Sequence, residues 1–188
     1  MEAERARLFV ALELPAAPRG ALVRWRDALD LSGLGFRALA PEALHATLCF
    51  LGWRLASEGE AISSACRAAI HDRGAPWTRF DQVLWLPSRS PRVLAVGLKD
   101  PGGALAALQA SIASALSVGG WYTPERRPFL AHVTVARAMR GKRARREQME
   151  APPAHAFPAA AVVLYRSRLE RGGARYEPLT RVELPSGA

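Results

Sequence analysis

Apolar and polar residues follow two different periods along this chain, and together they predict a fold built from both helices and strands. Short runs dense in apolar and β-branched residues, bounded by Pro, Gly or polar clusters, are typical of strands. Apolar residues spaced three and four apart are typical of amphipathic helices. Strands are predicted over residues 7–14, 44–51, 79–86, 92–99, 129–136, 160–169 and 174–183, and helices over residues 16–31, 57–71 and 102–117.

The order of these elements predicts the fold class. Several strands follow one another directly along the chain, and Gly172 and Gly173 separate the last two as in a hairpin. This mixed order favours an α+β protein with largely antiparallel pairing. The chain has 188 residues, a length that suits one domain with two lobes. We therefore expect a single domain over residues 1–188.

The charge of the chain is strongly basic. Lys and Arg number 26 against 17 Asp and Glu, which gives a formal net charge of +9, and 24 of the 26 cations are Arg. Guanidinium groups suit the bidentate recognition of phosphate, so the excess points to a polyanionic partner. A genomic bias toward Arg and Ala codons would explain the same excess.

Several protein classes are excluded by the composition. No run of 18 apolar residues is present, which argues against a transmembrane helix, and the charged first residues lack the apolar region of a signal peptide. We expect a cytoplasmic protein without a membrane partner. Cys49 and Cys66 are too few for a disulfide framework and form no Cys-x-x-Cys zinc motif.

A short motif occurs twice. Residues 44–50 read LHATLCF and residues 131–137 read AHVTVAR, so His-x-Thr followed by an apolar residue lies inside two predicted strands. The two histidines are 87 residues apart, which places the copies in different halves of the chain. A pseudo-symmetric fold would have this spacing.

Alternation predicts which side chains of the first motif share a face. His45, Thr47 and Cys49 should point one way and Phe50 the other. The imidazole and the hydroxyl then lie about 7 Å apart along one strand. Cys49 is interpreted as a small buried residue, because a thiol nucleophile would need its own activating base.

The same rule applies to the second motif. His132, Thr134 and Ala136 should share a face. Arg137 follows Thr134 by three residues, so it points away from that face if the strand runs on regularly, whereas a bend at the strand end would turn it back.

Two imidazoles and two hydroxyls on neighbouring strands suit the hydrolysis of a phosphodiester. The reaction needs a base for the attacking water and an acid for the leaving alkoxide, and an imidazole can do either near neutral pH. Threonine hydroxyls can donate to the non-bridging oxygens. Neither motif supplies a set of metal ligands. A single His-x-Thr is more often a satisfied polar group of the core, so the functional interpretation depends on the two copies.

Four segments, in order, resemble the bacterial and archaeal 2′-5′ RNA ligase (LigT-like) family, also called RNA 2′,3′-cyclic phosphodiesterases, of the two-histidine phosphoesterase superfamily. Residues 7–15 (RLFVALELP) resemble its first strand. Residues 44–52 (LHATLCFLG) and 127–137 (RPFLAHVTVAR) resemble its two signatures, and residues 164–179 its Ser-x-Leu and Tyr-x-x-Leu ending. Ala131 departs from the Pro that relatives commonly carry before the second histidine.

The resemblance implies a bilobal, pseudo-two-fold α+β fold in which two antiparallel sheets with outer helices enclose a central cleft. It also implies that the protein opens a terminal 2′,3′-cyclic phosphate on RNA to leave a 2′-phosphate, with no metal or other cofactor. Members are reported to join tRNA halves through a 2′-5′ linkage as well. The expected partner is therefore RNA with a cyclic phosphate end, including tRNA halves, and we expect the protein to be a monomer.

Roles in this reaction are assigned to the repeated residues. His45 is assigned as the general acid to the leaving 3′ oxygen and His132 as the general base to water, although hydrolysis and ligation use the pair in either sense. Thr47 and Thr134 are assigned as donors to the phosphate.

Other side chains are candidates for binding the rest of the RNA. Arg127, which matches a family position, and Arg137 could clamp a flanking phosphate, with solvated cations as the alternative. Phe9 and Tyr165 are candidates for stacking a terminal base, with burial in the core as the alternative.

A basic cluster follows the second motif and lies within residues 137–153, which are expected to form a mobile loop. Its side chains could follow an RNA backbone or could be a solvated charge run. They are Arg140, Lys142, Arg143, Arg145 and Arg146.

Two other functions stay open. The chain could be an RNA-binding module without turnover, in which case RNA affinity would depend on salt and not on His45 or His132. It could also be a phosphodiesterase for 2′-5′-linked oligonucleotides or small cyclic nucleotides, which a comparison of substrates would separate from the RNA enzyme.

Overall fold

The computed structural model describes residues 4–170 and 173–185, whose strands form one antiparallel sheet. The strands are β1 (Arg5–Glu13), β2 (Phe36–Ala38), β3 (His45–Leu55), β4 (Trp77–Leu86), β5 (Val93–Lys99), β6 (His132–Ala138), β7 (Ala156–Pro158), β8 (Ala161–Glu170) and β9 (Gly173–Glu183). The helices are α1 (Ala16–Asp27), α2 (Gly59–Ile70) and α3 (Ala104–Val118), with short 3-10 turns at Pro41–Ala43 and Ala56–Glu58.

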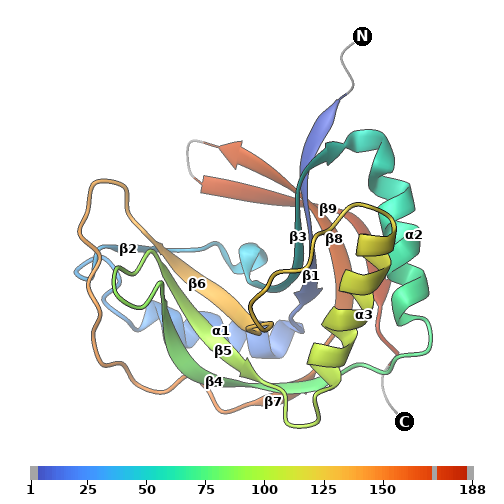
Figure 1. The fold of residues 1–188 in the computed structure, drawn as a ribbon. Coiled ribbons are helices and arrows are strands. Elements are labelled where there is room, and N and C mark those ends of the chain that lie inside the picture. The colour runs from blue at the N-terminus through green and yellow to red at the C-terminus, as the bar shows by residue number, and fades with distance from the viewer. Residues whose placement is uncertain (1–3, 171–172, 186–188) are drawn as a thin grey trace.

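The sheet consists of two halves that meet at a single point. Its strand order is β7-β4-β5-β6-β3-β1-β8-β9, with β2 added to β6. The first half ends at β6 and the second begins at β3, and one residue pair, Ala46 with Val133, joins them. The strands of the two halves diverge from this pair (Figure 1). The expected two-lobed α+β fold is confirmed, and the two expected sheets are the halves of one.

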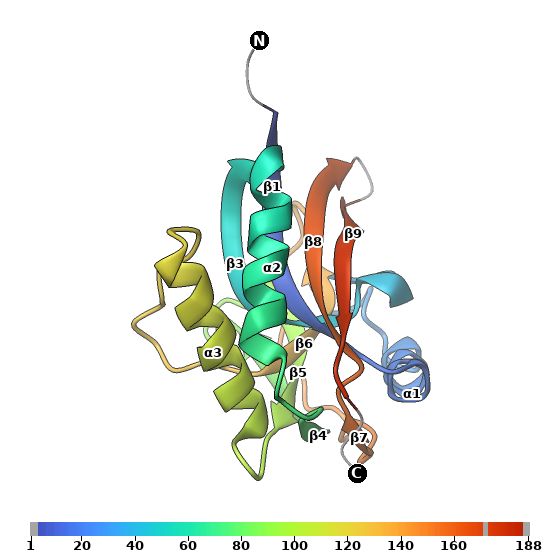
Figure 2. The same ribbon diagram turned by 90° about the vertical axis from the view of Figure 1, so that its right-hand side faces the viewer.

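Helices cover one face of this sheet. Helices α2 and α3 lie side by side against the half that contains β3, β1, β8 and β9 (Figure 2). Helix α1 lies with the other half, where Arg26 donates to the Leu39 carbonyl and the Trp25 indole donates to the Glu150 carbonyl. No helix of the described residues is long and apolar enough to cross a membrane. We call the face turned away from α2 and α3 the inner face.

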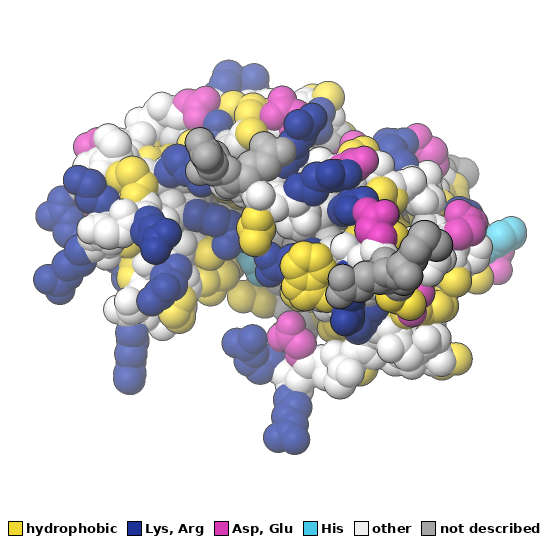
Figure 3. Space-filling model, turned by 90° about the horizontal axis from the view of Figure 1, so that it is seen from above, with side chains coloured by type: hydrophobic (Ala, Val, Ile, Leu, Met, Phe, Trp, Pro, Cys, Tyr) yellow, Lys and Arg dark blue, Asp and Glu magenta, His cyan; other side chains and the backbone are white. Residues whose placement is uncertain are grey.

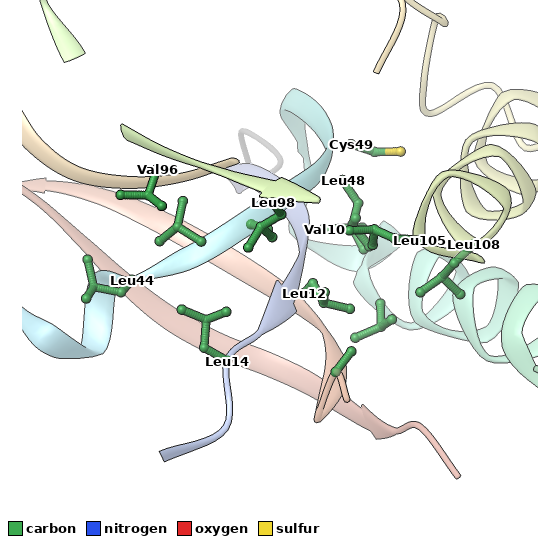
Figure 4. Close-up of a cluster of buried hydrophobic side chains, with 14 of the residues drawn as sticks. Val10, Leu12, Leu14, Leu44, Leu48, Cys49, Val96, Leu98, Leu105 and Leu108 are labelled. Carbon is green, nitrogen blue, oxygen red and sulfur yellow. The ribbon is translucent and has the colours of Figure 1, made fainter. Parts of the chain in front are cut away.

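One large apolar core runs through both halves. Leu12 of β1, Leu94 of β5 and Leu108 of α3 are almost completely buried in the same cluster. Side chains from β1, β3, β5 and α3 converge in it (Figure 4). Burying one such side chain stabilises the fold by roughly 1.5–3 kcal/mol. A smaller cluster around Phe9 lies on the inner face.

The elements differ from the predicted ones mainly at their ends. Helix α1 ends at Asp27 rather than residue 31, and β6 begins at His132 rather than residue 129. Strands β2 and β7 were not predicted, because three residues are too few to show a period. The expected hairpin of β8 and β9 is confirmed, and Gly172 lies outside the described residues.

The basic segment after β6 forms hydrogen bonds to other loops, and its expected mobility stays a prediction. The backbone N–H of Arg145 donates to the Leu34 carbonyl, and its guanidinium donates to the Gly33 carbonyl. The guanidinium of Arg146 donates to the Ser88 carbonyl. These hydrogen bonds tie the segment to two other loops, although it has no regular secondary structure.

Candidate active site

The pair that joins the two halves also brings the two motifs together. Strands β3 and β6 are antiparallel, and Ala46 lies opposite Val133. Both side chains are completely buried in the main core. In an antiparallel pair the residues on either side of such a pair point to the opposite face. His45, Thr47, His132 and Thr134 therefore lie together on the inner face, and we call them the quartet.

A β-bulge in β3 changes which residues share the face of His45. Thr47 pairs with Ala11, and Cys49 pairs with Val10, so Leu48 is an extra residue. Leu48 and Cys49 are both buried in the main core (Figure 4). The prediction that Cys49 shares a face with His45 is therefore wrong. Phe50, predicted to point the other way, is 47% exposed and pairs with Phe9 of the inner face.

The second motif contains the same irregularity. Thr134 pairs with Ala95 and Ala136 pairs with Leu94, which leaves Val135 as the extra residue. Val135 and Ala136 are both buried, and Arg137 is exposed. Alternation predicts that Ala136 shares the face of His132. This prediction is wrong, because Ala136 is buried in the core. The bulge turns Arg137 back to the inner face, because an extra residue inverts the alternation beyond it.

The two motifs are thus equivalent in structure as well as in sequence. Each has a histidine, a threonine, two consecutive buried residues and then a side chain on the inner face. That last side chain is Phe50 in the first motif and Arg137 in the second. The alternation of a regular strand could not reveal either position, because a bulge has no signature in this sequence.

A backbone carbonyl two residues before each histidine faces its Nδ1 atom. The Nδ1 of His132 is 2.7 Å from the Leu130 carbonyl oxygen, a hydrogen bond that requires a proton on Nδ1. A hydrogen bond from the His45 ring to the Ala43 carbonyl raises the pKa of His45, and its buried Nδ1 has no well-formed hydrogen bond. The hydrogen bond of His132 leaves its Nε2 to exchange a proton with a substrate.

The environment of His45 strongly disfavours its charged form. Burial and, to a smaller extent, the neighbouring side chains of Arg137 and His132 lower the pKa of His45 to about 4. Arg137, which the bulge in β6 turns to the inner face, is thus one of the groups that lower the pKa of His45. In the ligand-free protein at neutral pH the imidazole of His45 is therefore neutral.

Aromatic rings enclose His45 on the β1–β8–β9 side. The centroid of the Phe9 ring is 4.9 Å from that of the imidazole, and the ring of Tyr176 meets the imidazole edge-on at 5.1 Å. Phe9 is stacked on Tyr165 at 5.2 Å, and both rings are buried. Their burial explains the desolvation of His45. A role in base stacking stays a prediction for Phe9 and Tyr165, and Phe50 and Tyr176 are the more exposed rings.

Small residues lie beside the second motif. Ala95 pairs with Thr134, and Gly97 pairs with His132 on β5. A cavity of about 210 Å³ opens at Gly97. Its walls include Leu84, Leu98, Phe129, Leu130 and Ala131. The cavity lies beside the strand residue that pairs with His132, and no member of the quartet lines it.

The remaining candidates lie farther out. Arg127 is exposed and forms an ion pair with Glu125 at 3.3 Å, so its placement gives no sign of contact with the quartet. Lys and Arg side chains gather around the hollow between the two halves (Figure 3). In the described part of the chain, no three His, Cys, Asp or Glu side chains group in a way that could hold a metal ion.

Known proteins resemble this chain over almost its whole length. An RNA 2′,3′-cyclic phosphodiesterase of Escherichia coli (strain K12) is 32% identical over 181 residues, which are 95% of this chain and 96% of that protein. One of Geobacillus stearothermophilus is 30% identical over 179 residues, 89% of this chain and 54% of that protein. The crystal structure of E. coli LigT complexed with 3′-AMP matches with a TM-score of 0.76 and 32% identity, covering 96% of this chain and 99% of that one.

The family match covers both motifs and confirms the resemblance seen in the sequence. The 2′-5′ RNA ligase superfamily matches residues 14–171, which include every member of the quartet. The fold, the two antiparallel motifs and the similarity to these proteins agree with one another. The chain belongs to the 2′-5′ RNA ligase superfamily.

Proposed function

We propose that this protein hydrolyses a terminal 2′,3′-cyclic phosphate on RNA to a 2′-phosphate, without a metal ion. The observation that carries the proposal is the antiparallel pair of Ala46 and Val133, which sets two imidazoles and two hydroxyls on one face. The E. coli relative is named for the same reaction. E. coli LigT binds 3′-AMP, a nucleotide that carries a terminal phosphate.

The quartet can supply every proton transfer that the reaction needs. His132 takes a proton from water, whose oxygen attacks the phosphorus opposite the 3′ oxygen. The bond between phosphorus and the 3′ oxygen breaks, and His45 protonates the departing oxygen. Thr47 and Thr134 donate hydrogen bonds to the non-bridging oxygens, where the negative charge is concentrated. The phosphate stays on the 2′ oxygen.

A bound substrate supplies the negative charge that stabilises the protonated imidazole of His45. In the free protein, burial and the guanidinium of Arg137 keep the imidazole neutral. A bound phosphate anion offsets the charge of Arg137 and interacts favourably with an imidazolium, so it raises the pKa of His45. His45 therefore becomes a competent acid only when a phosphate is present.

The groups next to the quartet suit the rest of a nucleotide. Phe50 offers an exposed ring on which a terminal base can stack. Arg137 can pair with a phosphate oxygen. The same site could join two RNA ends if a 5′ hydroxyl replaced the water, since the cyclic ester already holds the activated phosphate. We include in the proposal tRNA halves as substrates, a monomeric state and a cytoplasmic location.

The proposal is tested with an RNA oligomer that ends in a 2′,3′-cyclic phosphate, incubated with the protein in EDTA. We expect a 2′-phosphate product. His45→Ala and His132→Ala should each lower kcat by about 10²- to 10⁴-fold while the thermal unfolding midpoint stays within a few degrees. Full activity in either variant, or no conversion by the folded protein, would contradict the proposal.

The direction of proton transfer has its own test. In a substrate whose leaving 3′ oxygen is replaced by sulfur, the leaving group needs no acid. The His45→Ala variant should then regain most of its activity, and the His132→Ala variant should not. Recovery of activity in His132→Ala and not in His45→Ala would show that His132 is the acid and His45 the base.

A further inference from the structure

Exposed apolar side chains continue along the inner face beyond the quartet. Large apolar residues are rarely left exposed in a group unless they form a binding surface. Phe50 is 47% exposed, Trp53 57% and Leu55 38%, and all three lie on β3. Leu169 of β8 is 74% exposed.

The register of β1 places these residues on the same face as the aromatic rings around His45. Phe50 pairs with Phe9. Trp53 pairs with Arg7, which lies two residues before Phe9 in β1. Directly paired residues of an antiparallel sheet share a face. Because Phe9 contacts the ring of His45, Phe50 and Trp53 belong to the inner face as well.

Two arginines of β1 lie opposite these apolar residues on the inner face. The guanidinium of Arg7 lies 4.8 Å from the centroid of the Phe50 ring. Arg5 pairs with Leu55, and its guanidinium donates to the Trp53 carbonyl at 3.3 Å. Within residues 4–170 and 173–185, neither arginine forms an ion pair with a carboxylate. The nearby carboxylate of Glu4 is paired with Arg166.

We propose that the segment Phe50–Leu55, together with Arg5 and Arg7, binds the RNA chain on the 5′ side of the cyclic end. This inference rests on the proposed function and adds a substrate class to it, namely RNA chains of two or more nucleotides rather than mononucleotides. The base next to the terminal one stacks on Trp53. Arg7 lies opposite Trp53 and beside the Phe50 ring, and Arg5 lies opposite Leu55, so the phosphates of that chain pass along these two arginines.

The spacing of the rings fits a single strand. The rows of Phe50 and Trp53 are two β1 residues apart, about 7 Å. That distance is roughly twice the 3.4 Å step of a stacked helix strand. Bases held by these rings are therefore splayed apart, as in the recognition of single-stranded RNA. The arginines beside the rings favour a polyanion over an apolar protein partner. The surface is also continuous with the quartet.

The test compares two substrates for each variant. One is a six-nucleotide RNA with a 2′,3′-cyclic phosphate end, and the other is a 2′,3′-cyclic mononucleotide. Trp53→Ala should lower kcat/KM for the oligomer by roughly 5- to 150-fold, through KM. It should leave kcat/KM for the mononucleotide within about twofold. Trp53→Phe should keep most of the activity on the oligomer.

A matched control is available on the other half of the sheet. Trp77 is 60% exposed at the start of β4, where it pairs with Pro158. Trp77→Ala should leave both substrates unaffected. If Trp53→Ala behaves like Trp77→Ala, or lowers the turnover of both substrates equally, the proposed RNA contact is wrong although the enzyme is an RNA cyclic phosphodiesterase.

A binding measurement separates failure of this inference from failure of the proposed function. A dye-labelled six-nucleotide RNA ending in a 2′-phosphate is titrated with the wild type and with each variant. Weaker binding to Trp53→Ala than to Trp77→Ala supports the contact even if neither cyclic substrate is turned over. Equal affinities contradict it.

Discussion

In the free protein the imidazole of His45 is neutral at neutral pH. Burial among Phe9, Tyr165 and Tyr176 and the nearby charge of Arg137 lower its pKa to about 4, against an ordinary value near 6.5. Between these two pH values the unfolded chain binds more protons at this residue than the folded protein does. The free energy of unfolding therefore rises with pH across that window.

Acid should consequently destabilise the wild type more than a variant without this imidazole. The contribution of His45 is complete above about pH 6.5 and is lost as the pH falls to about 4, up to about 3 kcal/mol. Urea unfolding at several pH values should give a shallower slope for His45→Gln in this window. Trp77→Ala, which changes an exposed residue without an ionisable group, is the control and should keep the slope of the wild type. Parallel slopes for all three proteins would show that His45 is not buried as described.

Single residues show how far the sequence predicts this site. His45, Thr47, His132 and Thr134 could be placed on one face because each pair lies within a regular stretch of its strand. Beyond Thr47 and Thr134 the alternation fails. The bulges there are determined by packing against β1 and β5 and not by the local sequence. Phe50 was therefore missed.

The bulges are the features of the strands on which the site depends. In β6, one extra residue allows both Val135 and Ala136 to enter the core while Arg137 returns to the inner face. If β6 were a regular strand and His132 and Thr134 stayed on the inner face, the side chain of Arg137 would point into the core. The cost of a buried, unpaired guanidinium opposes that register.

Deletion of Val135 tests this account. The shortened strand must either bury Arg137 or move His132 and Thr134 off the inner face. We expect a loss of at least about 3 kcal/mol of unfolding free energy, or a folded protein without activity. Deletion of Gly141, in the loop after β6, is the control and should cost much less. A folded, active protein without Val135 would contradict the described register.

The elements themselves were easier to predict than their junctions. Long strands such as β1 and β8 carry enough apolar residues to be recognised alone. The short strands β2 and β7 form because a neighbouring strand offers free backbone groups, which no local pattern reveals. The same applies to residues 139–155, which form hydrogen bonds to distant loops.

The two halves of the molecule share one core. Leu12 and Leu94 belong to opposite halves of the sheet and to the same buried cluster. We infer that the chain is a single domain that unfolds as one unit. Calorimetry should give one transition whose van't Hoff and calorimetric enthalpies agree.

Substitutions in either half should act on that same transition. Leu12→Ala and Leu94→Ala should each lower the unfolding free energy by about 2–5 kcal/mol, because both leave a cavity in a fully buried site. Trp77→Ala, at an exposed position, should have little effect. Two separate transitions in either core variant would show that the halves are independent.

The matching bulges have one more consequence, which concerns the direction of the proposed reaction. In the proposed reaction each motif gives one imidazole for the entering or the leaving oxygen and one hydroxyl for a non-bridging oxygen, so the residue types of the quartet alone do not tell the two sides apart. The motifs differ where Phe50 on one side corresponds to Arg137 on the other. A ring and a guanidinium that take no part in the proposed proton transfers therefore distinguish the two sides of the site.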